Sequence, residues 1–383
     1  MGEPAPVMQP GIGRGRVLQV LGSSAGGVAR HVAQIAELLS VPAPDGPGAT
    51  VHVAGPAALA DDVARPGGRV EFHPVPITDR PRAGDAAAVR RLRTLAAGAD
   101  VVHAHGLRAG ALAVLAARTL PRASRPRLVV TLHNLPVGGL RVRAVSGVLE
   151  RVVARGADVV LGVSGDLVDH ARSLGAHNVE RALVPAPDRP RPGADPATVR
   201  RGLGVPDGGA LVVTVARLAP QKGLDTLLDA AVRLRTLLPD GLRVLWVIAG
   251  EGPLRGQLVD QITERDAPVR LLGRRSDVSD LFVAADVVVS TAVWEGQPIS
   301  VQEALQLGAP VVATDAGGTR EVTGDFAAVL VPVGDAVAIA AAVARLLADP
   351  EERAGLATRA RARASELPDL TEVVAQLCRA YGT

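Results

Sequence analysis

The feature that most constrains the fold is a repeated pattern of short valine-rich runs. Each run is followed by a turn and then by apolar residues at helical spacing; residues 286–290 (DVVVS) and 299–307 show one such unit. Apolar runs of this length are typical of strands buried on both faces of a parallel sheet. The alternation continues through both halves of the 383-residue chain. It predicts two α/β domains with doubly wound parallel sheets, which bind ligands at the carboxyl ends of their strands.

Composition narrows the class of protein further. Aromatic residues make up only 2% of the chain, and its formal net charge is only +3. The chain therefore lacks the combination of clustered basic residues and stacking aromatic residues that nucleic-acid-binding proteins use. We therefore expect no nucleic-acid partner. The single cysteine, Cys378, excludes an internal disulfide and favours a reducing compartment. The first residues contain no apolar signal segment and no run of about 18 apolar residues occurs, so we expect a cytoplasmic chain with at most peripheral membrane contact.

The turn after residues 286–290 has the composition of an anion site. Glu295 begins it, and Pro298 is placed where a helix would start, a position that tolerates its missing N–H. Backbone amides at the first turn of a helix attract anions. Glu303 follows about one turn later, so two carboxylates would flank the site, as suits a nucleotide sugar with hydroxyls on both sides of its phosphates. The alternative is a solvated helix face. The candidate donor-binding residues here are Gly296, Gln297, Pro298, Ile299 and Glu303.

Residues 295–322 (EGQPISVQEALQLGAPVVATDAGGTREV) resemble the C-terminal signature of the family-4 retaining glycosyltransferases, the Glu-x7-Glu group with the GT-B fold. The resemblance continues more loosely over nearly the whole chain. It implies transfer of a sugar from a UDP- or GDP-sugar, with retention of anomeric configuration, to an unidentified acceptor such as a lipid-linked glycan, a cell-envelope component or a small molecule. It also implies that Glu295 holds donor-sugar hydroxyls and that Glu303 holds the ribose hydroxyls.

Arg217 and Lys222 lie five residues apart at a predicted strand-to-helix turn. Arginine offers a planar fork and lysine a compact charge, so the two can approach one pyrophosphate from different sides. Lys222 is the only lysine of the chain, which argues against an ordinary surface cation. The resemblance implies that both neutralise the leaving diphosphate. No Asp-x-Asp motif is present, so no metal is expected there, and no cofactor is expected because the nucleotide sugar is a co-substrate.

Three glycine-containing turns are further candidates for donor binding. One opens the first predicted helix without the spacing of a dinucleotide fingerprint and resembles the family's N-terminal loop; an ordinary tight turn is the alternative. The second, GEGP, would let a ligand approach the backbone closely, and the third would frame the base. These candidates are Gly26, Gly27, Gly250, Gly252, Gly273 and Arg274.

His103 and His105 end a predicted buried strand, and alternation along a strand directs both side chains to the same side. The resemblance implies that one histidine of this element contacts the donor sugar. We assign His105 by position, with a packed histidine as the alternative. The segment with Thr131 and His133 resembles the family's Thr-x-His loop.

Residues 141–155 combine apolar side chains at helical spacing with arginines at 141, 143, 151 and 155. Such a segment can rest on anionic lipid. The interpretation we prefer is a core-facing helix with a solvated basic side.

The chain is expected to divide into an acceptor-side domain (1–188), a linker rich in proline and glycine (189–208), a nucleotide-sugar domain (209–365) and a final helix (366–383) that crosses back to the first domain. Two other functions remain open: a catalytically silent nucleotide-sugar-binding partner in a cell-envelope complex, or a sugar-nucleotide epimerase on the same scaffold. Donor hydrolysis without acceptor, measured beside donor binding, would separate the silent binder from a transferase.

Overall fold

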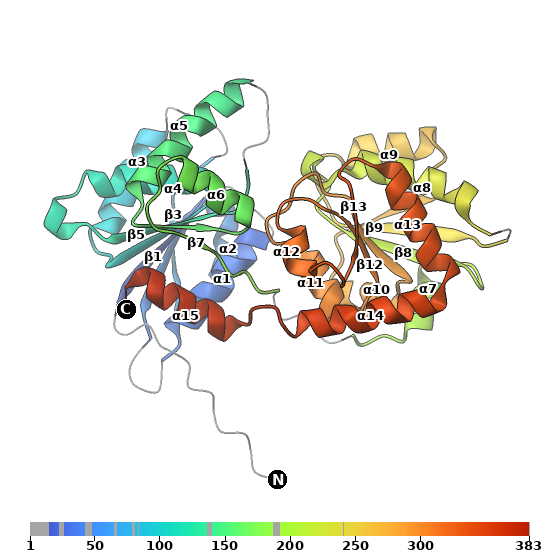
Figure 1. The fold of residues 1–383 in the computed structure, drawn as a ribbon. Coiled ribbons are helices and arrows are strands. Elements are labelled where there is room, and N and C mark those ends of the chain that lie inside the picture. Colours follow the sequence, from blue (N-terminus) through green and yellow to red (C-terminus); the bar gives the residue numbers. More distant parts are fainter. Residues whose placement is uncertain are drawn as a thin grey trace, which may run out of the picture. The chain divides into compact units, whose positions relative to one another are not determined.

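The computed structural model describes residues 15–22, 27–42, 48–64, 67–78, 81–82, 84–135, 140–186, 192–239 and 241–382. The chain divides into two compact units: Met1–Pro185 together with Pro368–Thr383, and Ala186–Leu367. Each unit contains one parallel sheet flanked by helices (Figure 1). The predicted fold class, with two doubly wound parallel sheets, is confirmed.

The first unit is built on a seven-stranded sheet in the order β3-β2-β1-β4-β5-β6-β7. Its strands are β1 (Arg16–Leu21), β2 (Thr50–Gly55), β3 (Glu71–Pro74), β4 (Val101–His105), β5 (Arg127–Leu132), β6 (Val159–Gly162) and β7 (Val179–Arg181). Its helices are α1 (Gly27–Ser40), η1 (Ala57–Leu59), α2 (Ala60–Val63), α3 (Asp85–Ala96), α4 (Leu107–Arg118), η2 (Arg122–Ser124), α5 (Leu140–Gly156), α6 (Gly165–Ser173) and α15 (Leu370–Tyr381).

The second unit is built on a six-stranded sheet in the order β10-β9-β8-β11-β12-β13. Its strands are β8 (Ala210–Val215), β9 (Val244–Ala249), β10 (Val269–Gly273), β11 (Val287–Ser290), β12 (Val311–Thr314) and β13 (Val329–Val331). Its helices are α7 (Pro196–Gly202), η3 (Pro220–Lys222), α8 (Leu224–Leu237), α9 (Arg255–Glu264), α10 (Val278–Ala284), α11 (Ile299–Gln306), α12 (Thr319–Thr323), α13 (Ala336–Ala348) and α14 (Pro350–Ala364).

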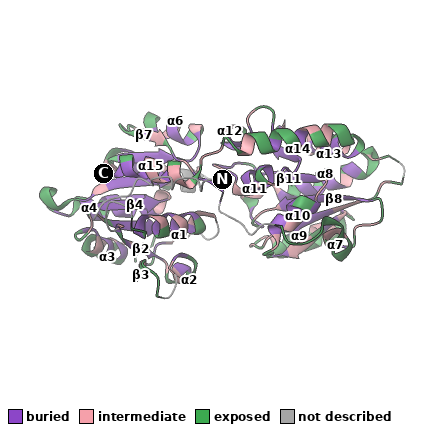
Figure 2. Ribbon diagram, turned by 90° about the horizontal axis from the view of Figure 1, so that it is seen from below, coloured by how far each residue is buried: buried purple, intermediate pink, exposed green. Residues whose placement is uncertain are grey.

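Valine-rich strands form the core of each unit because both of their faces are covered. In β8, Val212 and Val213 point to opposite faces, and both are fully buried. Burying a side chain of this size stabilises the fold by about 1.5–3 kcal/mol. Figure 2 shows the strands largely buried, while exposed residues gather on helices and loops. The cores are mainly aliphatic, and among the buried aromatic residues are Phe282 and Trp246, whose Nε1 donates to Thr214 Oγ1 over 3.0 Å.

Helix α7 lies within residues 189–208, where proline and glycine led us to expect no regular structure. Pro196 occupies the first turn of this helix, where a missing N–H has no cost. Asp195 caps the helix by accepting from Thr198 N over 3.0 Å. The Asp-Pro pair therefore starts a short helix instead of excluding one.

Helix α15 packs on the first unit. An Asp369–Glu372 capping box begins the helix, and its apolar face is buried. The Gln376 side chain joins it to the strand β7 region: Nε2 donates to Arg181 O over 2.7 Å, and Oε1 accepts from Leu183 N over 2.9 Å.

Helix α5 differs from the core-facing helix that we preferred. Val153 in its second half is buried, but Val145 is exposed and Val148 is 60% exposed. Only part of the predicted apolar stripe therefore reaches the core. Within the described residues, no helix is both long and apolar enough to cross a membrane.

Candidate active site

The candidate site of the second unit lies at the carboxyl ends of β8 and β11. These strands are neighbours in the sheet although β9 and β10 lie between them in the sequence. Open α/β sheets bind ligands at such a point, because the connections on either side leave in opposite directions. Arg217 and Lys222 follow β8, and Glu295 follows β11. The fold thus brings three predicted site residues to one edge of the sheet.

Lys222 and Glu295 form an ion pair, in which Lys222 Nζ donates to Glu295 Oε1. The side chains are 23% and 12% exposed, respectively, so solvent screens their attraction less than at an open surface. A lysine ammonium carries three N–H donors, and this pair uses one of them. The ammonium can therefore be held in place by Glu295 while it binds an anion.

Three further hydrogen bonds join the loop after β8 to the loop after β11. Val293 N donates to Gln221 O over 2.8 Å, and Gln221 Nε2 donates to Trp294 O over 2.8 Å. Thr291 Oγ1 donates to Lys222 O over 2.9 Å. Gln221 and Thr291 were not among the predicted site residues, because nothing in their spacing distinguishes them from ordinary loop residues.

Gly223 allows this close approach of the two loops. It has a φ of +59°, in the left-handed region, and links η3 to α8. A Cβ at this position would lie 2.1 Å from Thr291 O. A glycine is therefore needed here both for the backbone conformation and for the packing of the neighbouring loop.

The loop after β12 holds Glu295 by its backbone carbonyl. Gly318 N donates to Glu295 O over 2.8 Å. Gly317 has a φ of +53°, and a Cβ there would lie 2.1 Å from the same oxygen. The Gly-Gly pair of the predicted family signature thus shapes the chain that carries Glu295.

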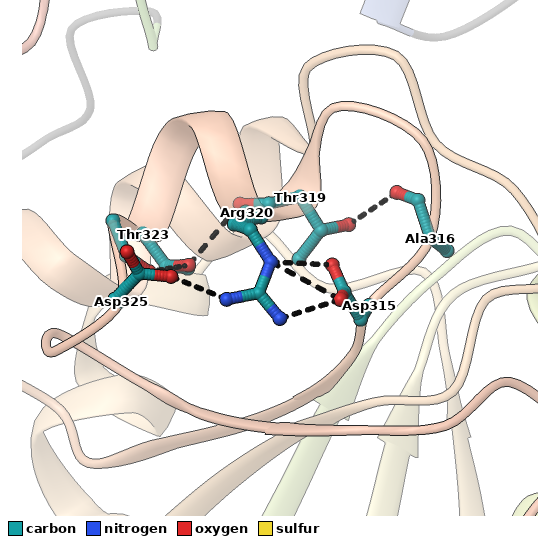
Figure 3. A network of polar contacts seen from close by, with 7 residues as sticks. Asp315, Ala316, Thr319, Arg320, Thr323 and Asp325 are labelled. Atoms are coloured by element: carbon teal, nitrogen blue, oxygen red, sulfur yellow. Dashed lines mark hydrogen bonds and ion pairs between the residues drawn. The ribbon is translucent and has the colours of Figure 1, made fainter. Parts of the chain in front are cut away.

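Arg320 braces the loop after β12 (Figure 3). Its Nη2 donates to Asp315 Oδ2 over 2.6 Å, and its Nη1 donates to Asp325. These bonds to two carboxylates raise the pKa of the Arg320 guanidinium. Thr319 Oγ1 closes the turn by donating to Ala316 O over 2.8 Å. Both ends of this loop are therefore fixed by side chains.

Helix α11 begins at Ile299, and Pro298 is its N-cap residue instead of its first helical residue. Pro298 O accepts from Val301 N and Gln302 N, both over 3.0 Å. In the described part of the chain, the amides of Gly296 and Ile299 donate to no protein acceptor. These amides suit the anion site expected at the start of this helix. Glu303 is buried about one turn further along.

Gly250 and Gly252 are required by contacts within the protein. A Cβ at Gly250 would lie 1.9 Å from Ala216 O, and a Cβ at Gly252 would lie 2.4 Å from Leu218 O. The loop after β9 therefore packs directly against the backbone on both sides of Arg217. The side chain of Arg217 is exposed at this edge.

The remaining candidate turn follows β10. Gly273 has a φ of +72°, and a Cβ there would lie 3.0 Å from Glu251 Oε1. Gly273 O accepts from Gly250 N over 2.8 Å, which joins this turn to the previous one. Arg274 is exposed next to it.

In the first unit, histidine side chains cluster at the end of β4. The His103 and His105 rings have centroids 4.1 Å apart, which confirms that both point to one side of the strand. His105 is 1% exposed. Its Nε2 lies 2.7 Å from Gln19 Oε1, and its Nδ1 lies 3.2 Å from His133 Nε2. Both ring nitrogens of His105 are therefore engaged within this unit.

Tyr381 of α15 joins the cluster from the C-terminal end of the chain. Its hydroxyl lies 2.8 Å from His103 Nδ1 and accepts from Gln19 Nε2 over 3.1 Å. His103 Nε2 lies 2.7 Å from Thr131 Oγ1. No spacing in the sequence connects residue 381 with residues 19 and 103, so these partners could not be predicted.

The hydrogen-bond directions in the cluster follow from the Gln19 amide. Its nitrogen faces Tyr381, so its oxygen faces His105, and His105 Nε2 must carry the hydrogen. A neutral imidazole has a single N–H, so His105 Nδ1 accepts from His133 Nε2. With neutral rings, each of the two hydrogen bonds of His105 has one donor and one acceptor.

His31 of α1 also belongs to the cluster, since its ring meets those of His105 and His133 edge-on. Burial depresses the pKa values of these histidines because it penalises the charged imidazolium. It lowers the pKa of His31 to about 4, and, with smaller contributions from neighbouring histidines, the pKa values of His103 and His133 to about 3. Burial, followed by the charges of the other cluster histidines, also lowers the pKa of His105 well below its usual value. All four rings are therefore uncharged at neutral pH.

Gly27 begins α1, the helix that carries His31, whereas Gly26 lies outside the described residues.

Two doubly wound sheets, with a cation and a carboxylate paired at the carboxyl ends of two strands, are typical of α/β proteins that bind ligands at this end of the sheet. The family models "Glycosyl transferase 4-like domain" and "Glycosyl transferases group 1" match residues 26–187 and 196–363. The chain belongs to this group 1, GT4-like family of glycosyltransferases with the GT-B fold, as the predicted resemblance indicated. It is a glycosyltransferase that uses a nucleotide sugar.

Relatives and solved structures agree with this assignment. The chain is 32% identical to the phosphatidyl-myo-inositol mannosyltransferase of Mycolicibacterium smegmatis over 94% of its own length and 90% of that protein. It is 31% identical to the D-inositol 3-phosphate glycosyltransferase of Salinispora arenicola, over 74% and 70% of the two chains. The crystal structure of Anabaena HepE in complex with UDP shares the fold, with a TM-score of 0.76, 23% identity and coverage of 96% and 99%.

Proposed function

We propose that the chain transfers a hexose from a UDP- or GDP-sugar to a hydroxyl of its acceptor, with retention of anomeric configuration and without a metal ion. The proposal rests mainly on the Lys222–Glu295 ion pair, which lies at the carboxyl ends of β8 and β11 and close in sequence to the start of α11. A fixed cation and backbone amides next to a carboxylate suit the two parts of a nucleotide sugar, its diphosphate and its sugar hydroxyls.

Charge development in the reaction explains the proposed residue roles. As the bond between the sugar and the diphosphate breaks, negative charge grows on the departing phosphate. Lys222, Arg217 and the amides of Gly296 and Ile299 would stabilise that charge without reorganising. Glu295 would accept hydrogen bonds from sugar hydroxyls, and the buried Glu303 from the ribose hydroxyls.

Retention of the anomeric configuration follows when the acceptor attacks the donor sugar on the same face from which the phosphate departs. The acceptor oxygen forms its bond to the anomeric carbon while the bond from that carbon to the phosphate oxygen breaks. The acceptor proton passes to the departing phosphate, so no protein nucleophile or base is required. A positively charged surrounding for the phosphate supports this route by stabilising the leaving group.

In the first unit we keep His105 as the donor-facing histidine. Both of its ring nitrogens already form hydrogen bonds, so contact with a sugar hydroxyl requires exchange of the bond to His133. The bond to Gln19 would then continue to orient the ring. The loop formed by Gly26 and Gly27 and the turns at Gly250, Gly252, Gly273 and Arg274 would line the remaining donor surface.

We propose an inositol hydroxyl as the acceptor. The names of two relatives, a phosphatidyl-myo-inositol mannosyltransferase and a D-inositol 3-phosphate glycosyltransferase, support this choice. The exposed Val145 and Val148 of α5, with the exposed Arg151 and Arg155, would allow contact with an anionic membrane surface that presents such an acceptor as a lipid.

A donor and acceptor panel tests the proposal directly. UDP- and GDP-hexoses are first screened for thermal stabilisation of the protein, and donors that bind are then incubated with inositol phosphate or with phosphatidylinositol vesicles. We expect product formation with one acceptor source, and NMR of the product should show the donor's anomeric configuration. An inverted product would contradict retention. Donor binding without transfer or hydrolysis would favour the silent binder, and a free epimerised sugar nucleotide would favour the epimerase.

Metal independence has its own measurement. Because Lys222, Arg217 and backbone amides are proposed to carry the diphosphate charge, transfer should continue at near-full rate in excess EDTA. A rate that disappears with EDTA and returns with a divalent cation would contradict this part of the proposal.

A further inference from the structure

Three side chains with metal-binding atoms meet at one edge of the first sheet. His52 lies in β2, and Glu71 and His73 lie in the edge strand β3. The strands pair in parallel, with His52 opposite Glu71 and Ala54 opposite His73. Residues two apart on a strand point to the same face. All three side chains therefore emerge on one face of the sheet, across a single pair of strands.

Their ligand atoms are as close together as the ligands of a metal ion. His52 Nδ1 lies 3.0 Å from His73 Nε2 and 3.3 Å from Glu71 Oε2, and His73 Nε2 lies 3.6 Å from Glu71 Oε1. Ligand atoms about 2.0–2.2 Å from a tetrahedral zinc ion are about 3.3 Å from one another. The three groups thus converge at the spacing that a zinc ion requires.

Burial and charge also suit a cation. The side chains of His52 and His73 are 31% and 14% exposed, and that of Glu71 is 65% exposed, so the histidines are held by the fold while the carboxylate leaves a path from solvent. Glu71 supplies negative charge at the site, and Arg91 is the nearby cation that works against binding.

We propose that His52, Glu71 and His73 bind one divalent transition-metal ion of the zinc type, with water completing its coordination. Two imidazoles and a carboxylate favour zinc or cobalt over magnesium or calcium, which prefer oxygen ligands alone. The ion would join the edge strand β3 to β2 and so stabilise that edge of the sheet. None of the three residues belongs to the proposed transfer machinery, so this inference does not depend on the proposed function.

Cobalt provides a direct test, because a tetrahedral Co²⁺ site with histidine ligands absorbs visible light strongly. The chelator-stripped full chain is titrated with Co²⁺, and Zn²⁺ affinity is measured by calorimetry. We expect one Co²⁺ per chain and displacement of its colour by one equivalent of Zn²⁺. We also expect Zn²⁺ to raise the unfolding temperature of the chain.

Three variants identify the ligands, and one serves as control. His52→Asn, His73→Asn and Glu71→Gln should each weaken Zn²⁺ binding by more than about 100-fold, since loss of a residue that only bonds to a ligand already costs 10–100-fold. The matched control is His177→Asn, which alters an exposed histidine elsewhere in the unit and should change nothing. Circular dichroism checks that each variant is folded.

Two outcomes would overturn the proposal. One is the absence of visible absorption with Co²⁺, which would leave a hydrogen bond between the two rings as the full explanation of their closeness. The other is equal Zn²⁺ affinity in the folded Glu71→Gln and His52→Asn variants and in the original chain.

Discussion

Lys222 is held between the left-handed Gly223 and the carboxylate of Glu295. Its backbone carbonyl also accepts a hydrogen bond from Thr291. The ammonium is thus positioned before any ligand arrives, which is the condition for stabilising a departing diphosphate without reorganisation. Its contribution to folding should be small, because a partly exposed ion pair stabilises a protein by about 1 kcal/mol or less.

The first prediction follows from the difference between the proposed role of Lys222 in sugar transfer and its small contribution to folding. Lys222→Gln should lower the rate of sugar transfer about 100-fold or more, as loss of one donor to a developing negative charge does in other enzymes. Its unfolding temperature should change little. The matched control is Arg265→Gln, which removes a surface ion pair with Asp229 and should keep full activity. A folded Lys222→Gln protein with near-normal turnover would remove Lys222 from the site.

At the level of elements, the loops after β8 and β12 support the Glu295 segment through backbone contacts, and glycines make those contacts possible. Gly223 has a positive φ and faces Thr291 O. Gly204 also has a positive φ, at +69°, but a Cβ there would meet nothing within 4 Å. The two positions therefore share the strain of a left-handed alanine and differ only in the clash.

The second prediction compares alanine substitutions at Gly223 and Gly204. Gly223→Ala and Gly204→Ala should each lose about 1–2 kcal/mol of unfolding free energy from the left-handed conformation. Gly223→Ala should in addition displace Thr291 and the loop that leads to Glu295, and so reduce donor affinity and turnover. Urea unfolding and steady-state kinetics on both variants separate the effects. Equal kinetics in the two proteins would show that the loop contact has no functional consequence.

Helix α5 provides the third prediction. Val145→Asp and Val148→Asp together should weaken binding to phosphatidylglycerol vesicles at least about tenfold, because two exposed apolar side chains are replaced by carboxylates, which the anionic lipid repels. The control is Val337→Asp, an equally exposed valine of α13. Vesicle flotation at low and high salt measures both. Undiminished flotation of the double variant would exclude this face of α5.

Periodicity predicted the strands and helices well, because valine runs and helical spacing depend on neighbours along the chain. Residue type and the family resemblance, and not periodicity, indicated Lys222 and Glu295 as site residues, and the structure pairs these two side chains. Periodicity did not predict contacts between segments distant in sequence. Pro298 is the N-cap of α11, and the backbone atoms that leave no room for a side chain at Gly250 and Gly252 belong to residues 216 and 218.

For the whole molecule, the buried histidine cluster links folding to pH. The pKa of His31 is about 4, and the pKa values of His103 and His133 are about 3, against 6.5 for an ordinary histidine. Between those values the unfolded chain binds protons that the folded chain does not. The free energy of unfolding therefore rises with pH through this window, is fully present above about pH 6.5, and is lost as pH falls toward 3.

The last prediction estimates how much the free energy of unfolding falls at low pH. At pH 5.5, one unit below the pKa of an unfolded histidine, each of these three histidines should lower the free energy of unfolding by about 1.4 kcal/mol relative to pH 7.5. Together they should lower it by roughly 4 kcal/mol, which is a large part of the stability of an ordinary protein. Urea unfolding at pH 7.5 and 5.5 measures this loss of unfolding free energy.

His31→Gln should make the loss smaller by about the contribution of one histidine. His31 meets the other rings edge-on, so its removal leaves the His105–His133 bond in place. The His177→Asn control, in which an exposed histidine is replaced, should reproduce the original slope. A stability that stays constant between the two pH values would mean that the folded cluster takes up protons as readily as the unfolded chain, and that burial does not lower these pKa values.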